Sequence, residues 1–292
     1  MGQRESNRGA STISLGRVQI VYNPLAGSFN APRLAALERA FTKAGHSPLM
    51  TECSSQTAFA LGDSTNHLCV AGGDGTIRQV VSALAGHASQ PPMSIYPMGT
   101  INLIAREWRV PRTPKAFVAS FETARQLHPV KLNEGWFVAC ASVGPDSRAV
   151  AGVSEDLKRR IGRFAYAASL AQQFVKWQRP KLSVEIDGNA MDCEALYIAN
   201  GRYFAGPWSF APTARVDQPV LHVVALTKAR RRDFAQFMIA TMLGKAHRLQ
   251  NARHLTCTSL SVSGDGPHLM QGDGDIVATL PIEMQITSQN AA

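Results

Sequence analysis

A glycine-rich loop, Gly72-Gly73-Asp74-Gly75-Thr76, constrains this chain more than any other feature of its sequence. The apolar run 68–70 before the loop is typical of a buried strand, and a helical pattern begins at its end. Glycine lets a bulky ligand approach the backbone closely. The start of a helix adds free N–H donors and the positive end of the helix dipole, which suit a phosphate. The loop therefore predicts a phosphate-binding turn between a strand and a helix.

Asp74 is the unusual member of this loop, because a carboxylate repels a phosphate unless a metal ion or a ribose hydroxyl lies between them. Its presence favours a nucleotide as the ligand, with Mg²⁺ held near Asp74. The loop has neither the spacing of a dinucleotide fingerprint nor the lysine of a Walker sequence. A tight turn without a ligand is the alternative interpretation.

The first half of the chain alternates short apolar runs with amphipathic segments. This pattern predicts strands at 17–22, 48–51, 68–71 and 94–96, and helices at 32–44, 56–61, 76–84, 102–108 and 114–121. Such alternation is typical of an α/β domain whose parallel sheet is covered on both faces.

Two further polar turns follow strands in this half. Asn23 and Gly27 belong to the first, and Gly99, Thr100 and Asn102 to the second. Ligands of parallel sheets bind at the carboxyl ends of the strands, so we expect both turns to join the glycine-rich loop around one nucleotide. Each turn taken alone is equally consistent with an ordinary capped turn.

The second half is rich in strands, which we expect at 136–142, 181–186, 195–199, 221–226, 255–262, 276–278 and 282–286. Helices are expected at 154–177 and 231–243. After Pro129 the pattern changes from alternating strands and helices to mostly strands. We therefore predict a nucleotide-binding α/β domain at 13–129 and a β-rich domain at 130–292. The polar residues 1–12 are predicted to form a disordered tail. The ligand cleft would lie between the two domains.

The 292 residues carry a formal net charge of +9, which suits anionic partners such as nucleotides or a membrane surface, or merely aids solubility. The five cysteines are isolated from one another, as expected for buried thiols in a reducing cytosol rather than for a disulfide framework or zinc site. No apolar stretch is long enough to cross a bilayer, and the first dozen residues lack a signal peptide's apolar core. We therefore expect a cytoplasmic protein.

The turns together resemble the lipid kinases of the diacylglycerol kinase catalytic-domain family, especially its compact bacterial members. The likeness rests on N-P-x-A-G at 23–27, G-G-D-G-T at 72–76 and P-M-G-T-x-N-x-x-A-R at 97–106. Segments 144–146, 199–206, 212–214 and 272–275 also resemble the family's later motifs. This resemblance implies an N-terminal α/β nucleotide domain and a C-terminal β-sandwich, as in NAD kinases.

The resemblance also implies a reaction, transfer of the γ-phosphate of ATP to a lipid hydroxyl. Asp273 matches the family's general base, and Asp275 matches a second carboxylate beside it. Asp74 would orient the nucleotide and its Mg²⁺, while the backbone at 73–76 and Thr100 would hold phosphates. Diacylglycerol is the acceptor that the family favours, and a sphingoid base is also possible.

Three departures from the family pattern affect these expectations. Leu103 stands where relatives have an aspartate, and Asp275 is shorter than the usual glutamate. Asp217 remains from an acidic cluster that binds a structural Mg²⁺ in relatives, but its neighbours are not acidic. A kinase of a soluble acceptor such as NAD, or a sensor with weak turnover, therefore stays open beside the lipid kinase.

The remaining expectations concern partners. The segment 154–177 places basic residues before aromatic ones, which would suit a peripheral membrane contact as well as a core-packed helix. We expect a lipid substrate at a membrane surface and no nucleic acid as a partner. The sequence leaves a monomer and a homodimer equally open.

Overall fold

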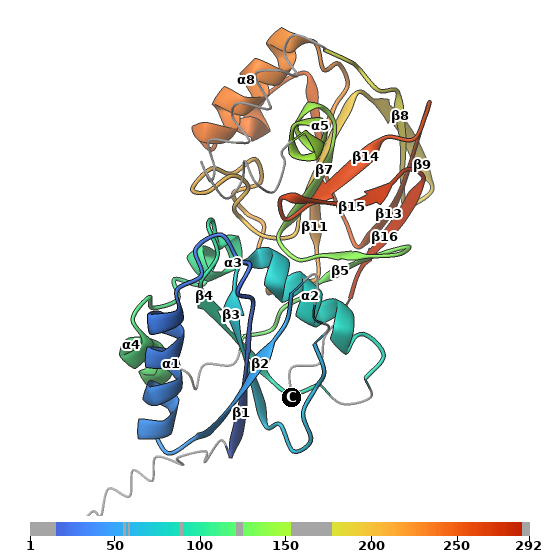
Figure 1. Ribbon diagram of the computed structural model, residues 1–292. Helices are drawn as coiled ribbons and strands as arrows, with labels where there is room; N and C mark the ends of the chain where they lie inside the picture. Colours follow the sequence, from blue (N-terminus) through green and yellow to red (C-terminus); the bar gives the residue numbers. More distant parts are fainter. Residues whose placement is uncertain are drawn as a thin grey trace, which may run out of the picture.

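The computed structural model describes residues 16–54, 57, 59–87, 90–120, 125–152 and 177–287. They form two lobes, an α/β domain and a β-rich domain (Figure 1). The expected tail at 1–12 lies outside the described residues, as does the expected helix at 154–177 except for Trp177.

The N-terminal domain is built on a four-stranded parallel sheet with the order β2-β1-β3-β4. Its strands are β1 (Arg17–Tyr22), β2 (Ser47–Glu52), β3 (His67–Gly72) and β4 (Met93–Pro97). Its helices are α1 (Ala31–Lys43), α2 (Asp74–Leu84), α3 (Leu103–Glu107) and α4 (Pro114–Ala119). The prediction of an α/β domain with a parallel sheet is confirmed.

Alternate residues of each central strand pack on opposite faces of this sheet. Ile20 belongs to a core with Phe41 of α1, whereas Val70 belongs to a second core with Val80 of α2. All four side chains are fully buried. Burial on both faces explains why these strands read as continuous apolar runs.

The C-terminal domain is a sandwich of two six-stranded sheets. One sheet has the order β12-β11-β10-β7-β14-β15, from β7 (Cys140–Val143), β10 (Ala195–Ala199), β11 (Leu221–Leu226), β12 (Ala252–Cys257), β14 (Leu269–Gly272) and β15 (Asp275–Thr279). The other has the order β6-β5-β16-β13-β8-β9, from β5 (Val130–Leu132), β6 (Trp136–Phe137), β8 (Leu182–Ile186), β9 (Asn189–Cys193), β13 (Ser259–Gly264) and β16 (Ile282–Ile286). A shared apolar core fills the space between them, which confirms the predicted β-sandwich.

Helices cover the outer face of the first sheet. α8 (Arg231–Met242) buries Phe234 and Phe237 near Tyr197 of β10, and the short 3-10 helix η1 (Ala246–Arg248) follows it. α5 (Pro145–Ala151) lies against β7 and against the hairpin of β14 and β15. Among the described helices, none combines the length and apolarity that a bilayer crossing requires.

Two strands that the sequence predicts as single are each divided between the two sheets. The expected strand 136–142 separates into β6 and β7, and 255–262 separates into β12 and β13. In both places the chain passes from one layer of the sandwich to the other within a continuous run of strand-forming residues. Apolar periodicity does not reveal such a crossing, because both pieces are buried in the same core.

Other elements were missed or misplaced by the sequence patterns. Strands β5, β9 and β14 and helix α5 were not predicted. The expected helix at 56–61 is wrong where it can be judged, since residues 59–61 are not helical. Residues 56 and 58 lie outside the described part of the chain.

Candidate functional site

The three glycine-containing turns meet at the carboxyl ends of β1, β3 and β4. A Cβ atom placed on Gly73 would lie 3.1 Å from the Cα atom of Gly99, and one on Gly27 would lie 2.5 Å from the hydroxyl of Thr100. Gly73 and Gly99 pack backbone against backbone, and Gly27 packs against the Thr100 side chain, so the three turns converge as predicted. The glycines add no side chains of their own to this junction, which leaves their main chain open to a closely approaching ligand.

Gly99 is the tightest point of the junction, because a Cβ atom on it would overlap the backbone of Gly73. We expect Gly99→Ala to separate the two loops and to abolish nucleotide binding, with a destabilisation of about 1–3 kcal/mol from overpacking. Gly266→Ala is the matched control, since its added Cβ would meet its nearest neighbour, His268, only at 4.0 Å. Thermal unfolding and ATP titration measure both effects, and wild-type ATP affinity in Gly99→Ala would contradict the prediction.

Two amides expected at the nucleotide are engaged in shaping their own turns. Asn102 has a left-handed backbone with φ of 55°, and its Oδ1 accepts the Gly99 N–H at 2.8 Å. The Oδ1 of Asn23 accepts the Leu25 N–H at 2.8 Å. A direct contact of either amide with a nucleotide stays a prediction, whereas their part in forming the loops is visible.

Asp74 connects the glycine-rich loop to α3. Its carboxylate accepts the backbone N–H groups of Leu103 at 2.8 Å and Ile104 at 3.2 Å, so it caps the start of that helix. Burial raises the pKa of Asp74, and these two hydrogen bonds oppose the rise. Thr76 is also buried, and its side chain fills the space beside Gly72.

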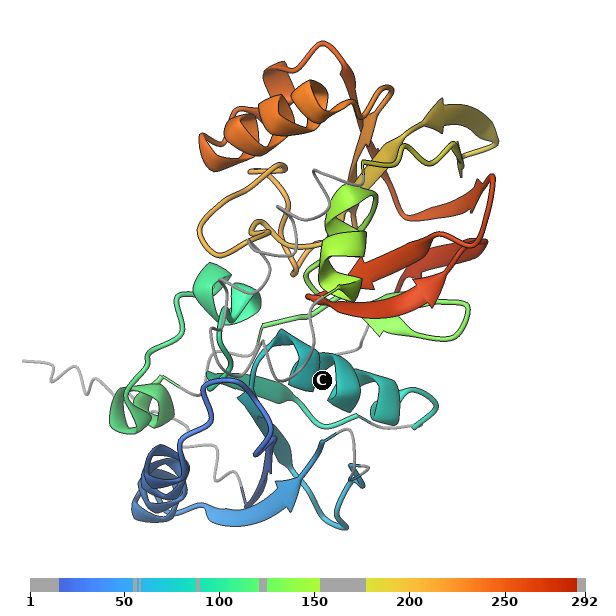
Figure 2. The ribbon, with the colours of Figure 1, turned by 45° about the horizontal axis from the view of Figure 1, so that its top comes forward.

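A hairpin turn from the C-terminal domain approaches the same loop. Asp273 and Gly274 join β14 to β15 with positive φ angles of 55° and 87°, as in a two-residue turn. A Cβ atom on Gly75 would lie 3.3 Å from Oδ2 of Asp275, which places this hairpin beside the start of α2. Figures 1 and 2 both show the red β14–β15 hairpin next to the cyan helix α2.

The carboxylate of Asp273 is held by backbone donors. It accepts the N–H groups of Val138 at 2.8 Å, Ala139 at 2.8 Å and Cys140 at 3.3 Å. These donors lie where the chain leaves β6 and enters β7, so the interruption of the predicted strand turns their N–H groups toward the hairpin.

Burial, together with the neighbouring Asp74, raises the pKa of Asp273 to about 6 against the opposing effects of Arg78 and the backbone donors. Asp273 is therefore a carboxylate that ionises just below neutral pH. A group with such a pKa is well suited to accept a proton at neutral pH.

Arg78 joins the two domains at this site, and the sequence patterns did not single it out. Its Nη1 donates to the carbonyl of Gly272 at 2.6 Å, and its Nη2 pairs with Oδ2 of Asp275 at 2.7 Å. Arg78 lies one turn into α2, so its guanidinium bridges the helix that starts at the glycine-rich loop and the carboxylate hairpin. The only sequence signal was a cation one helical turn after Asp74.

Glu107 forms a second connection between the domains, at the opposite end of α3. Its carboxylate accepts the N–H groups of Arg202 at 2.7 Å and Val216 at 3.0 Å. Asp217, the predicted remnant of a structural Mg²⁺ site, lies next to this contact and is exposed. Within the described ranges, no cluster of three His, Cys, Asp or Glu side chains is arranged to hold a metal ion.

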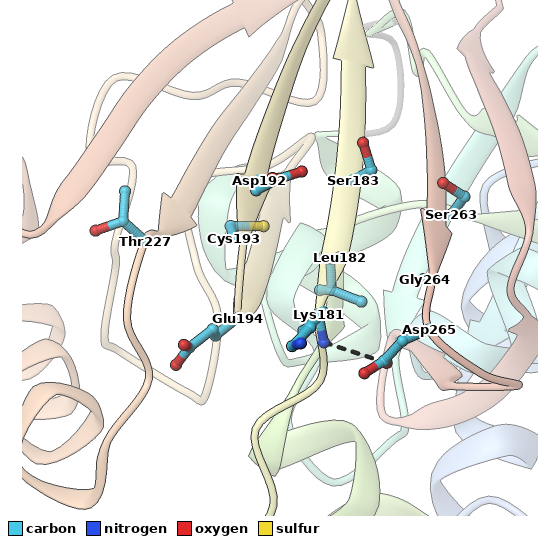
Figure 3. Close-up of a pocket in the computed structure, with 10 residues that line it drawn as sticks. All are labelled: Lys181, Leu182, Ser183, Asp192, Cys193, Glu194, Thr227, Ser263, Gly264 and Asp265. Carbon is cyan, nitrogen blue, oxygen red and sulfur yellow. Dashed lines mark hydrogen bonds between the residues drawn. The ribbon is translucent and has the colours of Figure 1, made fainter.

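A surface pocket of about 450 Å³ lies elsewhere, in the β-sandwich (Figure 3). Its lining includes Lys181, Glu194 and Asp265, and none of the predicted site residues. Within this lining, the carboxylate of Asp265 accepts the backbone N–H of Lys181 at 3.2 Å. The candidate site is therefore the contact region between the domains rather than this pocket.

Comparison with known proteins identifies both halves of the chain. Residues 17–134 match the diacylglycerol kinase catalytic domain, and residues 139–291 match the YegS C-terminal NAD kinase beta sandwich-like domain. A diacylglycerol kinase of Staphylococcus carnosus is 25% identical over 279 residues, covering 91% of this chain and 90% of the relative. One of Staphylococcus aureus strain MRSA252 is 24% identical, covering 91% and 88%.

Solved structures show the same fold. A diacylglycerol kinase of Bacillus anthracis superposes with a TM-score of 0.68 at 17% identity, covering 93% of this chain and 94% of the other. An NAD kinase of Archaeoglobus fulgidus in complex with ATP gives a TM-score of 0.51 at 12% identity, covering 93% and 90%. With its catalytic-domain match joined to a β-sandwich match that spans half its length, the chain belongs to the diacylglycerol kinase family and is an ATP-dependent kinase.

Proposed function

We propose that this kinase transfers the γ-phosphate of ATP to a lipid hydroxyl, with diacylglycerol as the acceptor and phosphatidic acid as the product. The observation that carries the proposal is the attachment of the Asp273 hairpin to α2 through Arg78. This attachment puts a proton acceptor beside a glycine-rich loop at a helix start, which are the two parts that phosphoryl transfer to an alcohol needs.

In the proposed mechanism, the phosphates of ATP lie against the backbone N–H groups at 73–76. Gly73 and Gly99 have no side chains of their own to hold a phosphate away from the main chain. The hydroxyl of Thr100 lies beside Gly27 and is available as a further donor. Such positioning and charge neutralisation provide most of the catalysis in phosphoryl transfer.

Asp273 acts as the general base. It accepts the proton of the lipid hydroxyl while that oxygen forms a bond to the γ-phosphorus and the bond to the β–γ bridging oxygen breaks, releasing ADP. The three backbone N–H groups that bind its carboxylate fix its position before the acceptor arrives. Asp275 carries no proton in this scheme and instead anchors Arg78.

The residues present fit a Mg²⁺ ion that arrives on the nucleotide. Mg²⁺ is usually bound by one or two carboxylates together with substrate phosphates and water, so a dedicated cluster of protein ligands is not required. Asp74 and Asp273 lie close enough for their charges to interact, which supplies carboxylate oxygens on the phosphate side of the site. The ion would neutralise phosphate charge. Asp74 would bind it through a carboxylate whose position is already fixed by hydrogen bonds to the start of α3.

We propose that the acceptor is met at a membrane surface. The net charge of +9 supports attraction to anionic lipid headgroups. Transfer to diacylglycerol should accordingly be faster in vesicles that contain anionic lipid than in neutral vesicles, and the difference should shrink as salt is added.

The reaction rate should rise with pH across the titration of Asp273. A base works only in its deprotonated form, and the pKa of Asp273 is raised to about 6. We therefore expect kcat to increase from pH about 5 to about 7 and to level off above it. Initial rates at saturating ATP and acceptor test this, and a flat profile through this range would count against Asp273 as the base.

The identity of the acceptor is tested by incubating the purified protein with γ-labelled ATP and Mg²⁺. Separate reactions contain diacylglycerol in mixed vesicles, a sphingoid base in the same vesicles, or NAD. Labelled phosphatidic acid supports the proposal. Labelled NADP would replace it with the alternative that the NAD kinase-like fold favours, and ATP binding without transfer to any acceptor would favour a sensor.

A further inference from the structure

We propose that a buried chain of three side chains, Asp146, Ser142 and Gln271, is a positioning device for the hairpin that carries Asp273. The proposal rests on the proposed function in assigning Asp273 as the base. It extends that function to residues on the side of the hairpin away from α2, where α5 (green) lies against β14 (Figure 2).

The chain crosses neighbouring strands of one sheet. Gln271 of β14 is directly opposite Ser142 of β7, which in turn is opposite Tyr197 of β10. Gln271, Ser142 and Tyr197 are therefore polar side chains on one face of the sheet, the face that α5 and α8 cover. Ser142 is fully buried and Gln271 is 3% exposed, so water does not satisfy their hydrogen bonds.

Gln271 connects the hairpin turn to the buried side chain of Ser142. Its Oε1 accepts the N–H of Gly274 at 3.1 Å, and its Nε2 donates to the hydroxyl of Ser142 at 2.8 Å. The hydroxyl of Ser142 donates to Oδ2 of Asp146 at the start of α5. One residue of the two-residue turn is thus linked through two side chains to a carboxylate on a helix.

The direction of each hydrogen bond follows from Asp146. A carboxylate only accepts hydrogen bonds, so Ser142 gives its proton to Asp146 and offers lone pairs to Gln271. The amide of Gln271 must then point its NH₂ group at Ser142, which leaves its oxygen facing Gly274. With the amide reversed, two N–H groups would face each other at the turn. Asp146 therefore fixes the orientation of Gln271 through Ser142.

The backbone conformation of the hairpin turn explains why its position requires support. Both of its turn residues have positive φ, and Asp273 is a non-glycine residue in that conformation. Burial raises the pKa of Asp146 to about 6, opposed by the Ser142 and Tyr197 hydroxyls. A buried carboxylate adds little net stability compared with apolar side chains, so a gain in positional precision is the role that accounts for it. In catalysis, a misplacement of about 1 Å can cost roughly 100-fold in rate.

The first test breaks the hydrogen bonds that link Gln271 to the hairpin and to Ser142. Gln271→Met keeps the length of the side chain and loses both hydrogen bonds. We expect kcat to fall at least about tenfold while KM for ATP changes less than about twofold, because the nucleotide loops are untouched. The matched control is Gln19→Met, since Gln19 is an equally buried amide that bonds Thr51 and the 60–65 segment of the other domain. It should lose stability without this loss of kcat.

Further variants separate positioning from simple loss of packing. Ser142→Ala interrupts the chain in its middle and adds no volume, so it should repeat the kcat effect even where Gln271→Met folds poorly. Asp146→Asn keeps an oxygen that accepts the Ser142 hydroxyl and should retain activity within about threefold, whereas Asp146→Ala should match Ser142→Ala. Equal activity in Asp146→Asn and Asp146→Ala, both near wild type, would overturn the proposal.

A measurement that does not depend on turnover distinguishes this proposal from the assignment of function. The carboxyl carbon of Asp273 can be titrated by NMR after aspartate labelling, with the Asp273→Asn spectrum as its assignment. We expect Gln271→Met to move the Asp273 midpoint and the amide signals of Val138 and Ala139, and Gln19→Met to leave them in place. Such a shift supports positioning even if no acceptor is phosphorylated. An unchanged titration together with unchanged kcat refutes it.

Discussion

Asp273→Asn should lower kcat by roughly 10²–10⁴-fold, the range that removal of a general base commonly costs. Asparagine keeps the size of the side chain and one oxygen that can accept the Ala139 N–H, so the hairpin should stay in place. Its amide has no basic site for the proton of the acceptor hydroxyl. The rate of phosphate transfer at saturating ATP and lipid measures the effect, and the affinity for ATP should stay close to wild type.

The stability of this variant is a useful internal check. The pKa of Asp273 is raised to about 6 in the folded protein, above its ordinary value of 3.8. The stabilising contribution of this group is thus complete below the ordinary pKa and is lost as pH rises through about 6. At neutral pH the ionised carboxylate opposes folding, so Asp273→Asn should not lower the unfolding temperature on account of lost charge. Asp265→Asn, which alters a carboxylate in the sandwich surface pocket, is the control and should keep full activity.

Arg78→Met should reduce kcat about 100-fold, the second largest effect on kcat that we expect. The substitution removes the bonds to the Gly272 carbonyl and to Asp275, so the hairpin is no longer fastened to α2. It also removes the cation that lowers the pKa of Asp273. With that pKa higher, a smaller fraction of the base is ionised at a given pH, and the acidic limb of the kcat profile should move to higher pH.

Two other variants separate the two effects of Arg78. Arg78→Lys retains a positive charge but not the planar fork that reaches two acceptors, so it should preserve the pH profile better than the rate. Arg179→Met removes a surface arginine that pairs with Glu194 at 2.6 Å and should change neither. If Arg78→Met kept both the rate and the pH profile of the wild type, the contact of Arg78 with Gly272 and Asp275 would have no catalytic role.

The parts of the site that the sequence predicted are those with local patterns. Glycines after a buried strand report a loop that a ligand approaches closely, and the meeting of Gly73 with Gly99 follows from the parallel order of β3 and β4. The general layout of two domains could be predicted for the same reason. The alternation of strands with helices in the first half, and the predominance of strands in the second, can both be recognised in short windows of sequence.

What the sequence could not predict depends on partners distant in the chain. Arg78 reads as an ordinary surface cation of a helix until the hairpin at 272–275 is placed beside it. Asn102 carries the same amide whether it binds a ligand or closes its own turn. The division of 136–142 into two strands also follows from tertiary structure, because the N–H groups of Val138 and Ala139 are taken by Asp273 rather than by a neighbouring strand.

The apolar interior of the nucleotide lobe contains Val138, Ala139, Cys140 and Val216, all contributed from beyond the predicted boundary at residue 129. A fragment ending there would therefore expose a hole beneath α2 where these side chains belong. Dissecting the enzyme into separately produced halves is a poor route to studying ATP binding alone. Heating the intact chain should melt both lobes in one cooperative event, as for a single folding unit.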